Sequence, residues 1–302
     1  VMGSKNLKAV CVQAGPPVAV ARPDSFKKIR RRWLDKIRDN PFCSFFSTYG
    51  SAGPLDKEAE AGILVSKNFS ITGDFPGVAA VSAGNLKKYF TGSHACFACP
   101  VHCIQAFRVT DGPYAGTTGV KMPEGCNSSC GPTCGNTDPG SLFMLNNMAN
   151  DYGLDILDFG LLMGTAMDWY EHGIIGPADT GGIELNWGDP EAMARMMENI
   201  ALRRGFGSVL ADGAVNAARQ AGGEAEKYVS SSKGMVFGGV DVRVLRGSAL
   251  CYATASRGAD HLRGGLLFEL HSKDGMNVIP PEEARERFGT DEVLNPKKKK
   301  KE

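Results

Sequence analysis

The sequence lacks any run of about 18 apolar residues, the length that a membrane-spanning helix needs. It also lacks a secretory signal at its start. No internal repeat is evident, which excludes a solenoid or a propeller. These absences predict a soluble, cytoplasmic protein with no membrane partner.

A strong charge imbalance is absent as well. The 34 Lys and Arg residues are balanced by 33 Asp and Glu residues, for a formal net charge of +1. Without the tail, residues 297–302, the counts become 29 basic and 32 acidic residues. Neither balance is the basic footprint of nucleic-acid binding, so no nucleic-acid partner is expected. Assembly into a homo-oligomer stays open.

What the sequence does have is glycine, cysteine and enough apolar residues for a core. Its 302 residues are 42% hydrophobic and 22% charged, which is typical of globular chains of roughly two domains. Six of the nine cysteines lie between Cys96 and Cys134. Clustered cysteines in a chain of this length, without a secretory signal, indicate metal ligands before disulfides.

The densest group is Cys96, Cys99 and Cys103, with the spacing C-x2-C-x3-C. Three sulfurs so close in sequence can converge on one point. Apolar neighbours such as Phe97 and Ile104 predict a buried setting. An iron–sulfur cluster and a zinc ion would each need one more ligand. The spacing alone leaves three interpretations open: an iron–sulfur cluster, a zinc site and buried thiols.

The second group is Cys126, Cys130 and Cys134. An i, i+4, i+8 spacing would align these residues on a helix, but Gly131-Pro132 should break that helix. A reactive cysteine, a metal ligand and a plain buried thiol all remain open here.

Helical patterns dominate the chain. They are expected over residues 25–39, 56–68, 141–152, 156–171, 190–204 and 210–221. A short strand is expected near residues 9–12, and residues 110–136, dense in Gly, Pro and Cys, are expected to form one long loop. The predicted fold class is therefore mainly α, with short strand remnants at the N-terminus.

The stretch Asp151-Tyr152-Gly153-Leu154-Asp155 predicts a tight connection between two helices. Gly153 is a candidate left-handed C-cap and Asp155 a candidate N-cap. One interpretation is an ordinary turn between helices. The other is a turn that presents a carboxylate and backbone groups to a polar heterocycle.

A late polar cluster combines Arg257, Asp260, His261 and Arg263 within seven residues, bracketed by small residues and glycines. Small residues let backbone approach a ligand, and His261 can exchange a proton near neutral pH. The alternative is an Arg–Asp ion pair on a loop.

In this order, the elements resemble the tungsten-pterin aldehyde:ferredoxin oxidoreductase family. The resemblance covers residues 1–10, the C-x2-C-x3-C run, residues 150–155 and residues 252–264. It implies helical domains of that family's type: residues 1–15 end a β-rich pterin domain, residues 16–230 form a helical domain with the cofactor motifs, and residues 231–302 begin a second helical domain.

The resemblance also implies a function, namely oxidation of a small-molecule aldehyde to a carboxylic acid. The cofactors would be a tungsten (or molybdenum) bis-pyranopterin and a [4Fe–4S] cluster, and ferredoxin would receive the electrons. Cys96, Cys99 and Cys103 would bind the cluster, and His261 would handle the proton. The remaining implied contacts are to the pterin cofactor: Lys5, Asn6, Asp151, Gly153, Leu154, Asp155 and Arg257.

The sequence departs from the family in three respects. The fourth cluster cysteine and the N-terminal pterin domain are not in these 302 residues, so this chain alone is expected to be inactive. Where the family has P-E-Y-E-T, this chain has Pro123-Glu124-Gly125-Cys126. Either Glu124 becomes the catalytic group, or Cys126 approaches the metal. The alternatives are a ring or acyl reductase of the same family and a zinc-stabilised helical binding module.

Overall fold

The computed structural model describes residues 2–73, 75–121, 123–238, 240–260 and 262. Helices predominate in this part of the chain and the sheets are small, so the predicted mainly α class is confirmed. None of the described helices is both long and apolar enough to cross a bilayer.

The first half of the described chain combines helices with the β1–β2 hairpin and a three-stranded antiparallel sheet of order β3-β4-β5. Its elements are η1 (Gly3–Lys5), α1 (Pro23–Arg38), α2 (Pro41–Tyr49), η2 (Gly50–Ala52), α3 (Leu55–Glu60), β1 (Val65–Ser66), β2 (Ile71–Thr72), α4 (Val78–Val81), α5 (Ala83–Leu86), η3 (Lys87–Tyr89), β3 (Phe90–His94), β4 (Ile104–Arg108) and β5 (Thr118–Val120).

The second half contains the longest buried helices. Its elements are α6 (Glu124–Ser129), η4 (Pro132–Cys134), α7 (Pro139–Tyr152), α8 (Ile156–Glu171), α9 (Pro177–Thr180), α10 (Pro190–Ala201), α11 (Phe206–Leu210), α12 (Ala214–Ala221), η5 (Ala225–Tyr228), β6 (Ser231–Ser232), β7 (Met235–Val236) and α13 (Arg246–Thr254).

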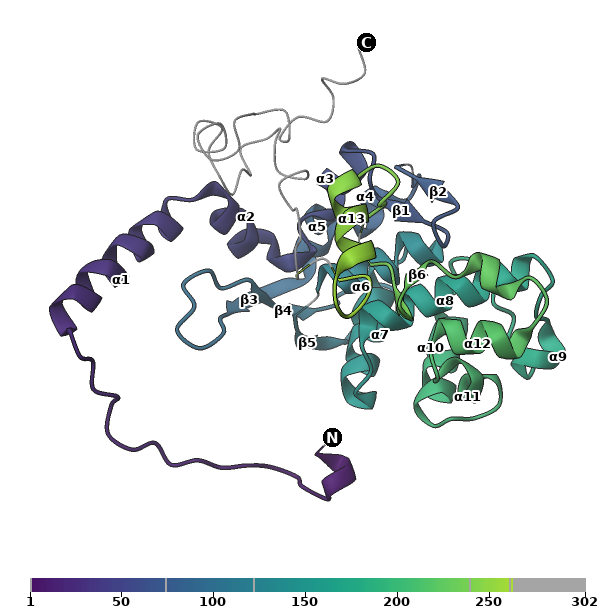
Figure 1. Cartoon of the computed structure of the whole chain (residues 1–302), viewed down its shortest axis with the longest axis horizontal. Helices are drawn as coiled ribbons and strands as arrows, with labels where there is room; N and C mark the ends of the chain where they lie inside the picture. Colours follow the sequence, from purple (N-terminus) through teal and green to yellow (C-terminus); the bar gives the residue numbers. More distant parts are fainter. Residues whose placement is uncertain (1, 74, 122, 239, 261, 263–302) are drawn as a thin grey trace, which may run out of the picture.

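Helix α8 forms the centre of the core, with α7, α6 and η4 packed against it (Figure 1). Its residues 159–169 are all buried, so the predicted buried helix over residues 156–171 is confirmed. Trp169 is fully buried and its indole N–H donates to the carbonyl of Ala225 at 2.9 Å. The buried Met residues of α10 add to the same core, because methionine fills irregular gaps between helices.

Two glycines let α8 approach its neighbours closely. A Cβ atom on Gly160 would lie 2.3 Å from the hydroxyl of Ser129, and one on Gly164 would lie 3.0 Å from the backbone of Thr133. The thiol of Cys134 donates to the carbonyl of Gly160 at 3.2 Å. Backbone therefore packs against backbone here, with no room for a side chain between the two segments.

The expectation of one long loop over residues 110–136 is wrong. Strand β5, helix α6 and the 3-10 turn η4 all lie within it. Each is six residues long or shorter, too short to show a hydrophobic period in the sequence. The predicted break at Gly131-Pro132 is confirmed, since α6 ends at Ser129 and η4 begins at Pro132.

Three other expectations need correction. The helix expected over residues 56–68 ends at Glu60, because Gly62 takes a left-handed φ of 72° and the chain turns into the β1–β2 hairpin. The helix expected over residues 210–221 is divided into α11 and α12 by Gly213, whose φ is 85°. The strand near residues 9–12 does not form: those residues are fully exposed, and a strand needs a hydrogen-bonded neighbour.

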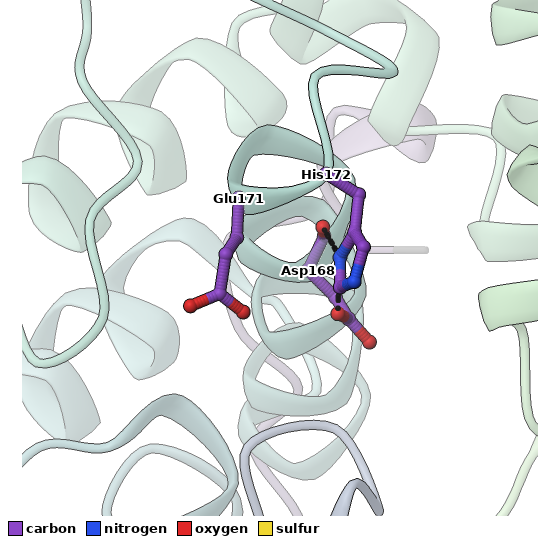
Figure 2. Close-up of side chains that lie close together, drawn as sticks. All are labelled: Asp168, Glu171 and His172. Carbon is purple, nitrogen blue, oxygen red and sulfur yellow. Dashed lines mark hydrogen bonds and ion pairs between the residues drawn. The ribbon is translucent and has the colours of Figure 1, made fainter.

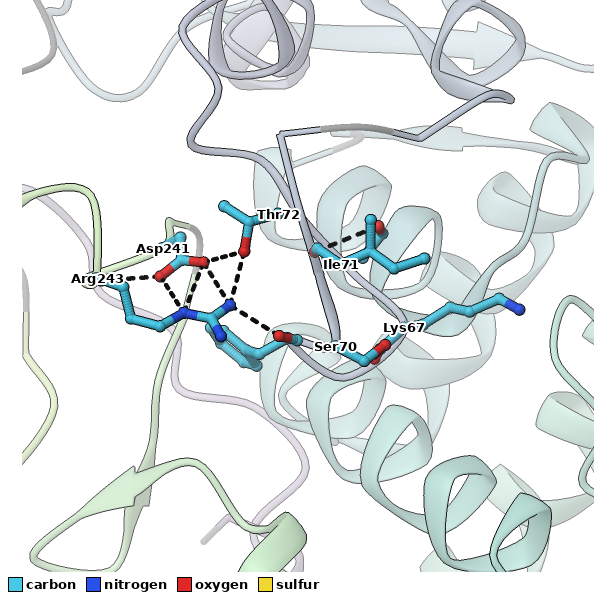
Figure 3. Close-up of polar contacts among 8 residues, drawn as sticks. Lys67, Ser70, Ile71, Thr72, Asp241 and Arg243 are labelled. Carbon is cyan, nitrogen blue, oxygen red and sulfur yellow. Dashed lines mark hydrogen bonds and ion pairs between the residues drawn. The ribbon is translucent and has the colours of Figure 1, made fainter.

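The segment that precedes α13 is hydrogen-bonded to the β1–β2 hairpin through a buried carboxylate (Figure 3). Asp241 accepts hydrogen bonds from Arg243 Nε at 2.9 Å and from the Thr72 hydroxyl. The Arg243 guanidinium also donates to the carbonyl of Phe69 at 2.7 Å. Burial opposes ionisation of Asp241, but these partners outweigh it and hold its pKa below the usual range.

The division into domains at residues 15 and 230 stays a prediction.

We expect Gly160→Ala to lower the free energy of unfolding by about 1–3 kcal/mol, because the added methyl group would overlap Ser129. Gly84→Ala is the matched control: it lies in helix α5 and its Cβ would meet only the Ser82 hydroxyl at 3.7 Å. Urea unfolding measures both. Equal stability of the two variants would show that α8 does not need this close approach.

Candidate functional site

The connection between α7 and α8 has the two caps that the sequence predicts. Gly153 takes a left-handed conformation, with φ 72° and ψ 32°, and ends α7. The carboxylate of Asp155 accepts hydrogen bonds from the backbone N–H groups of Leu157 at 2.9 Å and Asp158 at 3.1 Å, and so begins α8. The predicted turn is confirmed, and it leaves Asp151 and Asp155 exposed.

A polar cleft of about 620 Å³ lies on the Asp151 side of this turn. Its walls are strand β5 with the following Lys121, and a row of amides and one carboxylate on α7, namely Asn146, Asn147, Asn150 and Asp151. The volume falls within the range of about 300–1,000 Å³ that small-molecule and cofactor sites occupy. Amides and a carboxylate are the groups that hydrogen-bond a polar heterocycle.

A second cleft, of about 450 Å³, lies on the Asp155 side. It is lined by Asp155 and Leu157 from the turn, and by Lys233, Arg257 and Asp260 from the C-terminal part of the described chain. Two motifs that are about 100 residues apart in sequence therefore line one cleft. Partial desolvation, together with the charge of Asp155, raises the pKa of Asp158 in the same wall.

Within the late cluster, Arg257 Nε and Asp260 Oδ2 form an ion pair at 2.5 Å. The Asp260 side chain is fully buried, whereas the Arg257 side chain is 48% exposed. Arg257 and Asp260 therefore form the ion pair that one interpretation predicted. The same two residues also line a cleft, as expected if the cluster approaches a ligand. His261, the predicted catalytic histidine, and Arg263 lie outside the described residues.

In the chain, Glu124 lies between two residues that adjoin the clefts. Its neighbour Pro123 lines the first cleft, while a Cβ on its other neighbour, Gly125, would meet Leu157 of the second cleft at 3.2 Å. The Oε1 atom of Glu124 is buried and has no hydrogen-bond partner among the described atoms. Burial raises the pKa of Glu124, and a hydrogen bond with Ser128 offsets part of that rise. A raised pKa is what a proton-transferring carboxyl group needs near neutral pH.

Cys126, Cys130 and Cys134 are fully buried thiols of the core. Cys126 donates to the carbonyl of Leu142 at 3.5 Å, and the other two thiols donate to backbone carbonyls of α8. Burial raises the pKa values of Cys126 and Cys134 well above the usual range. Of the three interpretations that the sequence left open, this geometry fits the plain buried thiol, and it places Cys126 toward α7.

Cys96, Cys99 and Cys103 lie in the loop that joins β3 to β4. This loop projects from the helical body (Figure 1), and Phe97 is fully exposed, so the buried setting expected from its apolar neighbours is wrong. Left-handed backbone at Ala98 and His102, rather than a helical turn, shapes the loop. All three cysteines are free thiols.

The donor set consists of three thiol groups, which either an iron–sulfur cluster or a zinc ion could use together with a fourth ligand. The three sulfur atoms do not all lie within 4.8 Å of one another. Ligand sulfurs on a tetrahedral zinc would be about 3.8 Å apart, as follows from a Zn–S distance of about 2.3 Å.

The base of this cysteine loop is close to the first cleft along the small sheet. Lys121, in the cleft wall, donates its backbone N–H to the carbonyl of Gln105 at 2.7 Å. Gln105 is two residues from Cys103, a span of about 7 Å along an extended strand. Strands β4 and β5 therefore connect the cysteine loop to the cleft by a short path.

Two residues near the predicted sites carried no signal in the sequence. Cys43 on α2 lies against the cysteine loop, and partial burial and the neighbouring Cys99 raise the pKa of its thiol. Helices α1 and α2 line a cavity of about 370 Å³ together with Pro100 and Val101 of the loop. Glu58 on α3 is buried, and the charge of Glu124 contributes to raising its pKa. Both belong to elements distant in sequence from the motifs, so only the fold could reveal them.

Lys5 and Asn6, two of the residues expected to contact the cofactor, lie in the exposed N-terminal segment. Both lie in residues 2–33, which are exposed throughout. Neither lines the two clefts beside the α7–α8 turn. Their cofactor contact stays a prediction from the resemblance.

One further group has metal-ligand geometry: Asp168, Glu171 and His172 at the end of α8 (Figure 2). Asp168 already accepts a hydrogen bond from Asn68 at 2.9 Å, and His172 Nδ1 lies 3.2 Å from the same carboxylate. At about 1.5 Å per residue, this group is about 24 Å from the α7–α8 turn. We therefore assign it to the packing of α8 rather than to the site.

Comparisons with known proteins match one family over most of the chain. The family described as aldehyde ferredoxin oxidoreductase, domains 2 and 3, matches residues 28–301. A tungsten-containing aldehyde ferredoxin oxidoreductase from Pyrococcus horikoshii is 32% identical over 274 residues, which are 87% of this chain and 43% of that protein. The chain thus spans less than half the length of this relative.

Two further similarities are more distant. An aliphatic sulfonate oxidoreductase, WOR-like subunit, from Pyrococcus furiosus is 29% identical over 271 residues, which are 86% of this chain and 42% of that protein. The solved BamBC complex of benzoyl coenzyme A reductase, with 1,5-dienoyl-CoA, has a TM-score of 0.67 at 21% identity and covers 85% of this chain and 40% of that one. At that identity the likeness shows a shared fold.

The cap at Asp155 can be tested apart from any cofactor. We expect Asp155→Ala to cost about 1 kcal/mol of unfolding free energy, because the N–H groups of Leu157 and Asp158 lose their acceptor. Asp155→Asn is the matched control, since asparagine also caps and should cost only a few tenths. Chemical denaturation compares them; equal losses in both variants would contradict a capping role.

Proposed function

The chain belongs to the aldehyde ferredoxin oxidoreductase family, and on that premise we propose that it forms the part of a tungsten-pterin oxidoreductase that binds the iron–sulfur cluster and one side of the pterin cofactor. The observation that supports this most is the joining of the cysteine loop, through β4 and β5, to the cleft beside the α7–α8 turn. A loop of thiols and a polar cleft are the two halves that such a site needs.

The proposed reaction oxidises an aldehyde with water. The aldehyde and one water molecule give a carboxylate, two electrons and three protons. The site must therefore accept both the electrons and the protons. When bound, the tungsten (or molybdenum) bis-pyranopterin would accept the electrons from the substrate. The chain's own residues would orient the cofactor, exclude water and hold protons.

Each described candidate has a role that its position supports. Asp151, with the amides of α7, would hydrogen-bond the pterin ring in the first cleft. Gly153 and Leu154 would shape the turn, while Asp155 and Arg257 would contact the cofactor from the second cleft. Glu124 would take the proton in place of the family's second glutamate, because one oxygen of its carboxyl group is buried without a hydrogen-bond partner and its neighbour Pro123 lines the first cleft. Cys126 is turned toward Leu142 and would stay a core thiol.

Electrons would leave through a [4Fe–4S] cluster held by Cys96, Cys99 and Cys103. Exposure of the loop around Phe97 supports docking of a small electron carrier such as ferredoxin. His261 keeps its predicted role in proton transfer, and Lys5 and Asn6 keep theirs in cofactor binding.

Of the alternatives, the zinc-stabilised binding module has the weakest support. It requires a fourth ligand from Cys126, Cys130 or Cys134, yet these thiols point into the core and donate to backbone carbonyls. A ring or acyl reductase of the same family would use the same clefts and cysteine loop. The replacement of the family's second glutamate by Cys126 is the observation that favours this second function.

Anaerobic incubation with iron and sulfide tests the proposal. We expect the full chain to gain visible absorption and, after reduction, an EPR signal, since three thiolates share one loop. Each of Cys96→Ser, Cys99→Ser and Cys103→Ser should remove most of the bound iron. Cys11→Ser is the control, because Cys11 is another exposed free thiol away from the loop.

Two outcomes would overturn this assignment. One is a colourless, EPR-silent chain that holds a single zinc ion. The other is iron binding that the three loop substitutions leave unchanged.

A further inference from the structure

A second acidic side chain lies beside Glu124. Glu58 belongs to the short helix α3, which packs against α6, and it is only 8% exposed. Its Oε2 atom is buried and has no hydrogen-bond partner within the described part of the chain. Leaving such an oxygen unpaired is destabilising, and more so if the group is charged.

The two carboxyl groups interact electrostatically. Burial, and then the charge of Glu124, raises the pKa of Glu58 well above its usual range. Each residue has one buried oxygen without a partner, Oε2 on Glu58 and Oε1 on Glu124. Two buried carboxylates whose charges interact do not both stay ionised without a compensating charge.

A third side chain closes the site from α13. The hydroxyl of Tyr252 donates to the carbonyl of Gly238 at 2.5 Å, and the residue is 1% exposed. Burial, followed by the charges of Glu124 and others including Glu58, raises the pKa of Tyr252. Tyr252 thus stays neutral near the pair and supplies no positive charge.

The surrounding helices provide little positive charge. Lys57, on α3, forms an ion pair with Glu60 at 2.9 Å on the exposed side of that helix. It is the only Lys or Arg on the described elements α3, α6, α7, α8, η2 and η4; Arg246 begins α13, with its side chain outside the described atoms. The other titratable groups on these elements, on α13 and at their caps are Tyr49, Asp56, Glu60, Cys126, Cys130, Cys134, Asp138, Asp151, Tyr152, Asp155, Asp158, Asp168, Tyr170, Glu171, His172, Cys251 and Tyr252.

The pair also lies next to both clefts. Pro123, which lines the first cleft, directly precedes Glu124 in the chain. Gly125, which follows Glu124, lies against Leu157 of the second cleft. Gly238, the acceptor of the Tyr252 hydrogen bond, lines the second cleft as well. Glu124 therefore directly follows a residue of the first cleft wall, and Gly125 links it to Leu157 in the wall of the second.

We propose that Glu58 and Glu124 act as one buried proton-holding pair that keeps a proton at neutral pH, with Glu58 as the positioning residue that controls the protonation of Glu124. One proton removes one of the two buried negative charges and turns an orphaned acceptor into a donor. The role of the pair as a proton acceptor in aldehyde oxidation rests on the proposed function. The presence of a shared proton on the pair in the folded chain does not depend on that function.

The pH dependence follows from the raised pKa values of both carboxyl groups. The folded chain holds protons that the unfolded chain releases above about pH 4.3, the ordinary value for glutamate. This contribution to stability is complete below that pH and is lost as the pH rises through the raised values.

The full chain, without added metal or cofactor, is sufficient for the test. We expect the wild-type midpoint of thermal unfolding to fall between about pH 5 and pH 8 more steeply than that of Glu58→Gln or Glu124→Gln. At the upper pH each variant should exceed wild type by about 3 °C or more, given about 2–4 °C per kcal/mol for a domain of this size. Glu60→Gln is the matched control: this exposed glutamate of α3 should leave the slope unchanged.

Infrared spectroscopy supplies a second readout that does not depend on unfolding. At neutral pH, wild type labelled with ¹³C-glutamate should show a protonated carboxylic acid band that shifts with the label and is absent from the double variant Glu58→Gln/Glu124→Gln. Parallel pH profiles for all variants, together with no such band, would overturn the proposal. Stabilisation at pH 8 by Mg²⁺ or Ca²⁺ that Glu58→Gln abolishes would overturn it too, because the pair would then bind a cation. Neither readout involves iron or aldehyde turnover, so failure here is distinct from failure of the proposed function.

Discussion

The close approach of α8 to the segment formed by α6 and η4 is the constraint on which the rest of the described structure depends. Gly160 and Gly164 permit it, since a side chain at Gly160 would overlap Ser129 and one at Gly164 would press against Thr133. Buried thiols fill the remaining space and donate to backbone carbonyls of α8. This contact places the start of α8 and the start of α6 side by side, so that the α7–α8 turn and Glu124 occupy one region.

The site combines exposed and buried chemistry because of that contact. The α7–α8 turn faces two clefts of about 620 and 450 Å³, which suit a large polar cofactor. Behind it, burial of Glu58 and Glu124 keeps a pair of carboxyl groups away from water. Strands β4 and β5 connect the first cleft to thiols on an exposed loop. Binding, proton transfer and electron exit would thus occur in adjacent but differently solvated regions.

Local patterns predicted much of this from sequence alone. The caps at Gly153 and Asp155, the buried helix over residues 156–171 and the break at Gly131-Pro132 are set by nearby residues, and all are confirmed. Elements of six residues or fewer, such as α6 and β5, were missed because they are too short to show a period. Glu58 and Cys43 could not be found at all, since their partners Glu124 and Cys99 are more than 50 residues away in sequence.

Hydrogen–deuterium exchange across α6, η4 and α8, read by mass spectrometry over a denaturant series, tests the central claim most directly. If the packing of these segments holds the fold together, their slowest amides should exchange only through global unfolding, with the same free energy as denaturant unfolding. Exchange of residues 126–130 and 159–169 at a much lower free energy, insensitive to denaturant, would show that this contact opens locally and would contradict the account.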